Sequence, residues 1–491
     1  MTMQNLFPKP ADGWVGDVIP WQENGTFSLF YLHDIRETPK PGTPWRRFVT
    51  RDLVNFDEVG VALAAGAERA ADFNAYTGSV VRDESGTHHL FYTGQNPRIV
   101  GEDRLPLQLV MHATSDDDMA TWQRHPAHTF GASAGYESGD WRDPFVFRDD
   151  AAGLWRMLIA ARHTDGPERR RGVIAQCVST DLVHWQPAAP FWDPRRYIAH
   201  ECPEVFEWNG WWYLVYSEFS DAFTTRYRMS RSLDGPWQTP ANDSLDGRAY
   251  YAAKSAERDG RRLFFGWIAT REGARDDGPW QWAGTLSVLE ARQNPDGTLA
   301  FGFSDEMLDR WDTRDLLDDE RAFPRSLDAR GRHLAVTSDA ELPATFRATV
   351  RFQVTADTDD FGVLLRASAD GDTAYSIRLE PRRNRMVFDR WPRRRTGDGQ
   401  WEVSGDVPHV IELERPCELS VGEHVLDIIV DEDICVANLD RAVVLSARIY
   451  DLPAGRFGVF ASEGTVGITH ATVTVPAPVP DPIPALAAAT R

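Results

Sequence analysis

Cysteine and positive charge are both scarce in this chain of 491 residues. The four cysteines, Cys177, Cys202, Cys417 and Cys435, lack the paired short spacing of a zinc site. Lys and Arg number 53 against 74 Asp and Glu, which gives a formal net charge of −21. Nucleic acid and anionic membranes attract a positive field, so we expect neither as a partner.

Targeting and membrane-spanning segments are also missing from the sequence. The start, Met-Thr-Met-Gln-Asn-Leu-Phe-Pro, has no basic region followed by an apolar stretch, as a secretory signal would have. No run of 18 or more apolar residues is long enough to span a bilayer as a helix. Four thiols without a signal predict a cytoplasmic protein with reduced cysteines.

Aromatic residues are abundant, with 18 Trp, 12 Tyr and 25 Phe. Flat apolar rings suit the C–H faces of sugars, and they suit the cores of β-sheets equally well. Composition alone favours the core and leaves sugar binding open.

A weak repeat runs through the first 300 residues. Each copy has an apolar, aromatic strand and a second strand that ends near Ser/Thr-x-Asp and an aromatic residue. A repeat of roughly 50–66 residues made of short strands is typical of a propeller, and five copies predict five blades. An unrelated series of β-hairpins is the alternative. The copies begin at Phe27, His89, Trp155, Trp211 and Arg262.

The pattern changes after Asp305. A charged connector over 305–322 precedes short alternating strands over 323–476, which predict a β-sandwich. Residues 477–491 are rich in Pro and Ala and are expected to form an extended tail. We therefore predict an all-β fold, in which a five-bladed β-propeller over 1–304 is followed by the C-terminal sandwich.

Three carboxylates stand at equivalent points of the repeat. Asp17, Asp143 and Glu201 each precede the aromatic strand of a copy, namely the first, third and fourth. A propeller gathers such positions around one axis, so the three side chains could face one cavity. Paired carboxylates, with a third acid to hold hydroxyl groups, are the equipment of a glycosidase. Any one of these acids alone would more simply be a turn cap or a surface charge.

The motifs around these acids carry a family resemblance over nearly the whole chain. Arg142-Asp143-Pro144 resembles the Arg-Asp-Pro motif of glycoside hydrolase family 32, the invertase, inulinase and levanase group, and Glu201-Cys202-Pro203 resembles its Glu-Cys-Pro motif. Tyr76-Thr-Gly-Ser79 is similar to the family's Phe-Ser-Gly-Ser element. The resemblance implies a propeller joined to a sandwich, with no metal or organic cofactor.

The resemblance also implies a role for each acid. Asp17 would attack the anomeric carbon, Glu201 would protonate the leaving oxygen and then activate water, and Asp143 would bind ring hydroxyls with Arg142 beside it. Such a two-step displacement retains configuration and predicts the carboxyls of Asp17 and Glu201 about 5–5.5 Å apart.

The sequence departs from the family around the first acid. The family has Trp-x-Asn-Asp-Pro-Asn-Gly where this chain has Trp14-Val-Gly16-Asp17-Val-Ile-Pro20. Leu32 and Arg47 stand where the family often has Gln and His. These changes surround the sugar site. The residues predicted to bind substrate are Trp14, His33, Asp34, Arg47, Tyr76, Ser79, Arg142 and Trp282.

The resulting hypothesis is a retaining hydrolase that releases terminal β-fructofuranosyl units from sucrose or short fructo-oligosaccharides. A fructosyltransferase, or a glycosidase for another furanoside in the same fold, is a second hypothesis. A catalytically weak sugar-binding propeller is a third. The expected partner is a small carbohydrate, and a homo-oligomer is left open.

Overall fold

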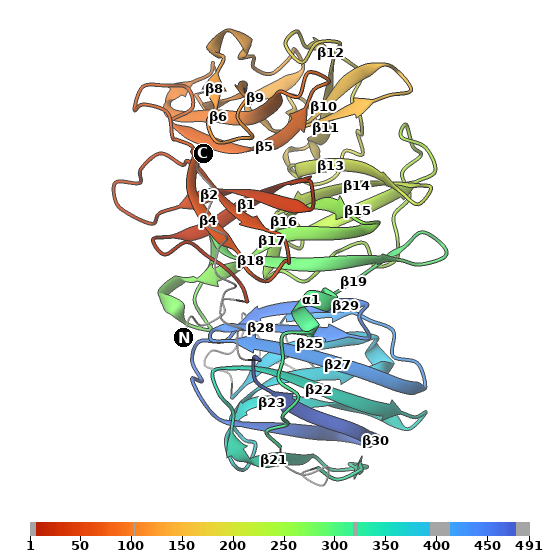
Figure 1. Ribbon diagram of the computed structural model, residues 1–491. Coiled ribbons are helices and arrows are strands. Elements are labelled where there is room, and N and C mark those ends of the chain that lie inside the picture. Colours follow the sequence, from red (N-terminus) through yellow and green to blue (C-terminus); the bar gives the residue numbers. More distant parts are fainter. Residues whose placement is uncertain (1–5, 103, 318–322, 393–412, 478–491) are drawn as a thin grey trace.

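The computed structural model describes residues 6–102, 104–317, 323–392 and 413–477. Nearly all of its regular structure is β-strand, arranged as a propeller stacked on a sandwich (Figure 1). The predicted all-β class, with a propeller followed by a C-terminal β-sandwich, is confirmed. Almost all of the predicted tail lies outside the described residues, as does part of the connector.

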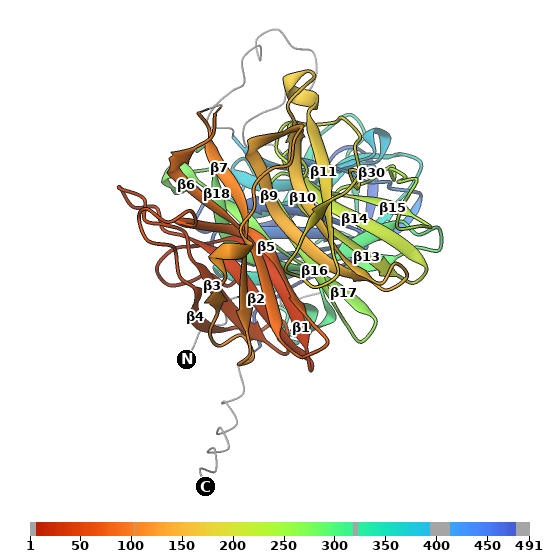
Figure 2. The same cartoon turned by 90° about the horizontal axis from the view of Figure 1, so that it is seen from above.

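The propeller consists of five antiparallel blades that follow one another along the chain and surround a common axis (Figure 2). Blade I is β1 (Trp14–Glu23), β2 (Thr26–Asp34), β3 (Trp45–Thr50) and β4 (Asp57–Leu63); blade II is β5 (Asn74–Arg82), β6 (His88–Val100), β7 (Pro106–Ser115) and β8 (Gln123–Arg124); blade III is β9 (Tyr136–Asp149), β10 (Leu154–His163), β11 (Gly172–Ser179) and β12 (Gln186–Pro187); blade IV is β13 (Glu201–Trp208), β14 (Trp211–Glu218) and β15 (Thr224–Ser230); blade V is β16 (Tyr250–Arg258), β17 (Arg261–Arg271), β18 (Trp280–Gln293) and β19 (Leu299–Gly302).

The inner strands of the blades are more buried than the outermost strands β4, β8 and β12, because each blade packs between two others. β2 and β17 are buried almost throughout, which explains why they appear in the sequence as continuous apolar and aromatic runs. Blades V and I are joined where Val15 lies opposite Gly284 and where the Leu286 N–H donates to the Pro8 carbonyl at 2.9 Å. This contact brings the first and last blades together and closes the ring.

The sandwich has two layers that share one long strand. The first part of β30 (Arg456–Thr474) pairs with β23, and its second part pairs with β22, so that it crosses from one layer to the other. In β22 buried and less buried residues alternate strictly, as expected for a strand with one face in the core. The other strands are β20 (Ser326–Asp328), β21 (Leu334–Glu341), β22 (Thr345–Val354), β23 (Thr358–Ala367), β24 (Ala374–Glu380), β25 (Arg385–Trp391), β26 (Leu413–Pro416), β27 (Gly422–Asp431), β28 (Ile434–Leu439) and β29 (Val443–Arg448).

Within the described ranges, helical structure is confined to single turns. The α-helix α1 (Asp305–Leu308) follows the last propeller strand and is capped by the hydroxyl of Ser304, which accepts a hydrogen bond from the Met307 N–H. The 3-10 turns are η1 (Pro126–His128), η2 (Glu168–Arg170), η3 (Glu272–Ala274) and η4 (Pro381–Arg383). No helix among the described residues is long and apolar enough to cross a membrane.

Blade V of the propeller docks directly on the sandwich strand β29. The buried carboxylate of Asp246 accepts hydrogen bonds from the backbone N–H of Ser446 at 3.0 Å and from its hydroxyl at 2.6 Å. The guanidinium of Arg448 donates to the carbonyls of Ile268 and Ala269 on β17, at 2.8 and 3.0 Å. β29 is an edge strand, and the propeller supplies hydrogen-bond partners for polar groups that would otherwise be unpaired.

This interface predicts the effect of removing Asp246. Asp246→Ala leaves the buried N–H and hydroxyl of Ser446 without their acceptor, so the free energy of unfolding should fall by about 1–3 kcal/mol. Denaturant titration followed by tryptophan fluorescence measures this change. Glu68→Ala, which breaks the exposed ion pair with Arg98, is the control and should change stability by less than about 1 kcal/mol. Equal effects of the two variants would contradict the interface described here.

Candidate active site

A cavity of about 460 Å³ lies where the five blades converge, and residues from every blade line it. Its lining combines carboxylates, cations and aromatic rings. The lining residues are Asp17, Leu32, Lys40, Tyr76, Thr77, Gln108, Asp140, Arg142, Asp143, Glu201, Phe219 and Trp282.

The first strand of each blade has a β-bulge at the level of this cavity. The pairing register shifts between Val15 and Val18, between Tyr76 and Gly78, between Glu201 and Glu204, and between Tyr251 and Lys254, and β9 shifts at the same point opposite Leu158. A bulge redirects side chains and interrupts the ladder of backbone hydrogen bonds. The repeated bulges therefore explain how acids on separate strands face one space.

The two Pro-containing motifs lie at these bulges. Asp143 has a φ of 58° and Cys202 a φ of 50°, and each is followed by a proline, which has no N–H to place in a ladder. Arg-Asp-Pro and Glu-Cys-Pro are thus the local sequences that form the bulges of β9 and β13. The left-handed conformation is more accessible to Asp than to most residues.

Asp17 lies at the bulge of β1 and accepts hydrogen bonds on both carboxylate oxygens. The Thr77 hydroxyl donates to Oδ2 at 2.5 Å, and the Trp267 indole N–H donates to Oδ1 at 3.1 Å. Burial raises the pKa of Asp17, and the negative charge of Asp143 raises it further. The carboxylate is held in one orientation in which it lines the cavity.

Asp143 is almost fully buried and is fixed through the backbone. Its Oδ2 accepts a hydrogen bond from the Cys202 N–H at 2.9 Å, and its own N–H donates to the Thr93 hydroxyl at 2.8 Å. The bulges of β9 and β13 are therefore tied together at the carboxylate of Asp143, which places Asp143 and Glu201 in the same part of the cavity.

Glu201 is the first residue of β13 and is held from two sides. Arg142 Nη2 lies 3.0 Å from Oε1, and the Tyr251 hydroxyl donates to Oε2 at 2.7 Å. Burial raises the pKa of Glu201, and the charge of Arg142 opposes this rise without cancelling it. The environment thus favours a protonated carboxyl more than water does.

Arg142 is the cation at the centre of the acids. Its guanidinium contacts Asp140 and Glu201 and lies 4.0 Å from Asp143 Oδ2. Burial lowers the pKa of Arg142, but the neighbouring carboxylates raise it well above its usual range, so the side chain stays charged. This single cation reduces the repulsion among three carboxylates.

Lys254 is a second cation, buried beneath the cavity on β16. It is 2% exposed, and its Nζ donates to the Gly78 carbonyl at 2.8 Å. Gly78 follows Thr77, which donates to Asp17, so Lys254 supports the segment that holds this carboxylate. Its positive charge also favours the ionised form of Asp17.

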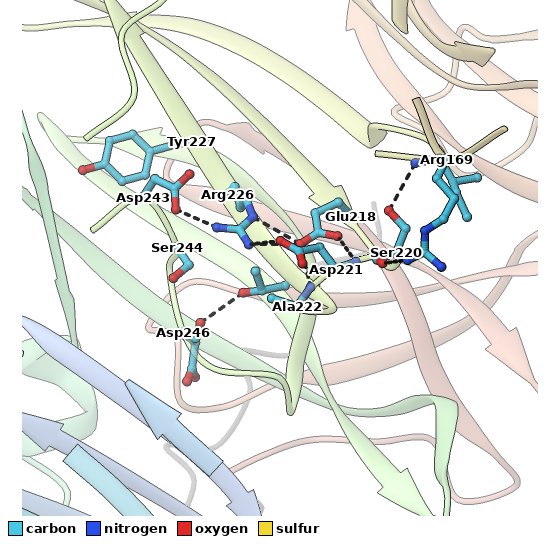
Figure 3. Close-up of polar contacts among 12 residues, drawn as sticks. Arg169, Glu218, Ser220, Asp221, Ala222, Arg226, Tyr227, Asp243, Ser244 and Asp246 are labelled. Atoms are coloured by element: carbon cyan, nitrogen blue, oxygen red, sulfur yellow. Dashed lines mark hydrogen bonds and ion pairs between the residues drawn. The ribbon is translucent and has the colours of Figure 1, made fainter. Parts of the chain in front are cut away.

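The loop after β14 contributes to the lining of the cavity from blade IV. The buried carboxylate of Glu218 accepts hydrogen bonds from the N–H groups of Asp221 at 2.9 Å and Ala222 at 3.0 Å, and it pairs with Arg226 (Figure 3). Within this loop Phe219 lines the cavity. Phe223 stacks on Tyr251 with ring centroids 4.2 Å apart. The loop therefore supports the tyrosine that contacts Glu201.

Six of the residues predicted to be catalytic or to bind substrate line the cavity: Asp17, Tyr76, Arg142, Asp143, Glu201 and Trp282. Ser79 is not among the lining residues. Its hydroxyl donates to the Pro144 carbonyl and accepts from the Val146 N–H, both at 2.9 Å. Ser79 thus joins β5 to β9 and holds the strand that bears Asp143.

The other four predicted substrate-binding residues do not line the cavity. Asp34 pairs with Lys40, which does line it, at 3.0 Å. His33 is buried and contacts Asp12 and Arg46. Arg47 donates to the Met119 carbonyl at 3.1 Å and packs on Phe30, and the ring of Trp14 is covered by Lys9 and Arg36.

Several residues of the site were not singled out in the sequence. Thr77 lies inside the Tyr76–Ser79 motif, and Asp140 lies two residues before Arg142 of the Arg-Asp-Pro motif. Their nearness to these motifs is the sequence signal that could have identified them. Gln108, Lys40, Phe219, Trp267 and Lys254 come from segments with no such motif. Among the described residues, no group of three or more His, Cys, Asp or Glu side chains is arranged to hold a metal ion.

Comparison with known proteins shows the family to which the chain belongs. A sequence model of the glycosyl hydrolases family 32 N-terminal domain matches residues 8–293. The chain belongs to glycosyl hydrolase family 32. This confirms the family resemblance carried by the Arg-Asp-Pro and Glu-Cys-Pro motifs.

Individual relatives of this family 32 protein are distant. A fructan 6-exohydrolase of Triticum aestivum is 30% identical over 208 residues, which is 40% of this chain and 33% of the wheat protein. A sucrose-6-phosphate hydrolase of Escherichia coli is 25% identical over 308 residues, 59% of this chain and 62% of that protein. The crystal structure of exo-inulinase from Aspergillus awamori matches with a TM-score of 0.75 and 19% identity, over 96% of this chain and 98% of that one, and it shows a shared fold.

The cysteines give a test of the packing around the site. All four are free and buried. Burial raises the pKa of Cys177, Cys417 and Cys435 to about 12 each, and burial together with Asp17 and Asp143 raises that of Cys202. Because the thiolate is the reactive form, the native protein should give no fast reaction with a disulfide reagent at pH 8. Four thiols should react after denaturation, and a fast native thiol would contradict the packing.

Proposed function

We propose that this protein is a retaining glycoside hydrolase that releases terminal β-fructofuranosyl units from sucrose or short fructo-oligosaccharides. The observation that supports this most is the placement of Asp17, Asp143 and Glu201 around one cavity, with separate hydrogen-bond partners for each acid. Membership of family 32 agrees with it. The matched relatives are longer than the segments they share with this chain, so the substrate is part of the proposal.

In the first step the Asp17 carboxylate attacks the anomeric carbon of the terminal sugar. The glycosidic C–O bond breaks, and the proton of Glu201 passes to the leaving oxygen, so that the leaving sugar departs as an alcohol. Asp143 accepts hydrogen bonds from ring hydroxyls and stabilises the positive charge that develops on the ring. The product of this step is a fructosyl ester of Asp17.

In the second step water reaches the same anomeric carbon. Glu201, now a carboxylate, takes a proton from the water as its oxygen bonds to the carbon, and the bond to Asp17 breaks. Two displacements at one carbon retain its configuration. Transfer to a sugar hydroxyl in place of water follows the same course and would make the protein a transferase.

The proposed mechanism requires opposite protonation states for the two catalytic acids. Asp17 has to be ionised to attack; burial and the charge of Asp143 raise its pKa, and the Thr77 and Trp267 donors together with the charge of Lys254 oppose this rise. Glu201 has to be protonated, and its burial favours that form. The two carboxyls interact, so their titration steps belong to the pair.

The location and partners proposed for the protein follow from the sequence. We propose a cytoplasmic enzyme that acts on imported disaccharides or short oligosaccharides. The four free thiols are compatible with a reducing compartment. An oligomeric assembly is left open.

Substitution of the two acids tests the mechanism. Glu201→Gln removes the proton donor, so kcat/KM on sucrose should fall about 10²–10⁴-fold. Its loss should be much smaller on an aryl β-fructofuranoside, because an aryl oxide leaves without protonation. Asp17→Asn should lose activity on both substrates, and Glu84→Gln, at an exposed turn, should lose none. Chromatography of released fructose measures the rates, and inverted configuration of the first product by NMR would contradict the two-step mechanism.

The hydrogen bond from Tyr251 predicts a change in pH dependence. The Tyr251 hydroxyl donates to the Glu201 carboxylate and so lowers its pKa. Activity requires protonated Glu201 and is lost as pH rises through that pKa. Tyr251→Phe should therefore raise the pKa and move the alkaline limb of kcat/KM about one unit to higher pH.

The acidic limb of the same profile provides the comparison. It reports ionisation of Asp17, whose direct hydrogen-bond donors are intact in Tyr251→Phe, so it should move much less. Tyr136→Phe, outside the cavity, should leave both limbs in place. A shift of the alkaline limb to lower pH in Tyr251→Phe would show that the tyrosine does not stabilise the Glu201 carboxylate.

A further inference from the structure

A row of alternating charges leads away from Arg142 in blade III. Asp140 lies two residues before Arg142 on β9, and its Oδ1 pairs with Arg142 Nη1. The other oxygen of Asp140, Oδ2, lies 3.6 Å from Arg162 Nη1 on β10. Arg162 Nε lies 3.4 Å from Glu137 Oε2, and Glu137 Oε1 pairs with Arg171 at 2.8 Å. Each member of this charge row, Asp140, Arg162, Glu137 and Arg171, therefore contacts a neighbour of opposite sign.

The charge row joins the active-site cavity to a second cavity. Asp140 lines the first, whereas Glu137, Arg162 and Arg171 line a separate cavity of about 720 Å³. The side chains of the row are between 11% and 27% exposed, so solvent ions screen their charges less than on an open surface. A change of charge at the outer cavity therefore alters the electrostatic potential in the inner one.

Asp140 also limits the directions that the Arg142 side chain can take. Arg142 Nη1 donates to Asp140 and, at 3.3 Å, to Gln108 Oε1. The other amino group, Nη2, is left to contact Glu201 Oε1 at 3.0 Å. The five N–H donors of a guanidinium have a fixed planar geometry, so holding one amino group also orients the other. The direction of Arg142 toward Glu201 therefore depends on its two acceptors.

We infer that the charge row is a set of positioning residues for the acid–base carboxyl of Glu201. Asp140 orients Arg142 and offsets part of its positive charge, and Arg162 in turn offsets the charge of Asp140. The row thus fixes how much of the Arg142 charge acts on Glu201. The inference rests on the proposed function, in which Glu201 has to carry a proton in the first step.

The surroundings of Glu201 give the charge of Arg142 particular weight. Burial raises the pKa of Glu201, and the attraction of Arg142 is the largest influence that lowers it. A change in the net charge around Arg142 should therefore move this pKa. The charged and titratable groups that line the cavity or interact with Glu201 are Asp17, Lys40, Asp140, Arg142, Asp143, Cys202 and Tyr251.

Substitutions within the row should change the pH dependence according to the sign of the charge removed. Asp140→Asn keeps an oxygen that accepts from Arg142 but loses the negative charge, which favours ionised Glu201. Activity is lost as pH rises through the pKa of Glu201, so the alkaline limb of kcat/KM on sucrose should move about 0.5–1 unit to lower pH. Arg162→Gln removes a positive charge and should move this limb about 0.3–0.5 unit to higher pH.

Further variants distinguish charge from disturbed packing. Arg162→Lys keeps the charge and should leave the limb in place, and Asp140→Asn/Arg162→Gln should lie close to the wild type. Glu137→Gln, at the outer cavity, should move the limb in the direction of Asp140→Asn by less, and it replaces that variant should Asp140→Asn fail to fold. Glu68→Gln and Arg98→Gln, from an exposed ion pair, are the matched controls and should move nothing.

The orienting role of Asp140 has a readout of its own. Asp140→Ala removes the acceptor as well as the charge, so of the two acceptors that hold Arg142 Nη1 only Gln108 remains. The kcat of Asp140→Ala at its own pH optimum should therefore fall about 10-fold or more below that of Asp140→Asn. Equal kcat values in the two variants would overturn the orienting role.

The outcomes separate this inference from the proposed function. Carbon-13 NMR of labelled glutamate carboxyls, with Glu201→Gln to assign the signal, follows the titration of Glu201 without turnover. Shifts of Asp140→Asn and Arg162→Gln in the same direction, or no shift in either, overturn the inference and leave the proposed function in place. Failure of the wild-type protein to cleave sucrose or short fructo-oligosaccharides overturns the proposed function, and the NMR titration then still decides whether the charge row acts on Glu201.

Discussion

Four carboxylates line one cavity in this protein, and their mutual repulsion constrains the residues around them. Removing an ion from water costs several kcal/mol unless opposite charges and hydrogen bonds replace the solvent. Arg142 lies among Asp140, Asp143 and Glu201, while Asp17 depends on neutral donors and on the more distant charge of Lys254. Burial raises the pKa of both Asp17 and Glu201, and the charge of Arg142 opposes this rise at Glu201.

The bulges of the inner strands allow the fold to place these carboxylates around one cavity. A regular strand would direct alternate side chains into the core between blades and leave few pointing to the axis. Interrupting the ladder at the same level in each blade frees backbone N–H groups, one of which, that of Cys202, binds Asp143. Next to the bulge of β9, the Ser79 hydroxyl bonds to the Pro144 carbonyl and the Val146 N–H and so joins β5 to β9.

The sandwich contributes to the cavity from outside it. Between β17 and β18 a loop contains Asp276, whose carboxylate accepts hydrogen bonds from the Tyr450 N–H at 2.8 Å and the Tyr375 hydroxyl at 2.7 Å. β18 begins directly after this loop and contains Trp282. The sandwich therefore anchors the strand that contains Trp282, which lines the cavity.

The five-fold repeat, the change to a sandwich and the strands that bear Asp17, Asp143 and Glu201 could all be predicted from the sequence. These depend on hydrophobic periodicity and on short motifs, which are local properties of the chain. The sequence also showed that Gly16 and Leu32 depart from the family.

Which side chains meet could not be predicted in this way and is known from the folded structure. It placed Ser79 and Arg47 in contact with backbone carbonyls, and it brought Trp282 from blade V against Gly16 of blade I. Such contacts join residues far apart in the chain, and they depend on how closed blades and bulges orient each side chain. No local pattern encodes that orientation, because it arises from packing between whole blades.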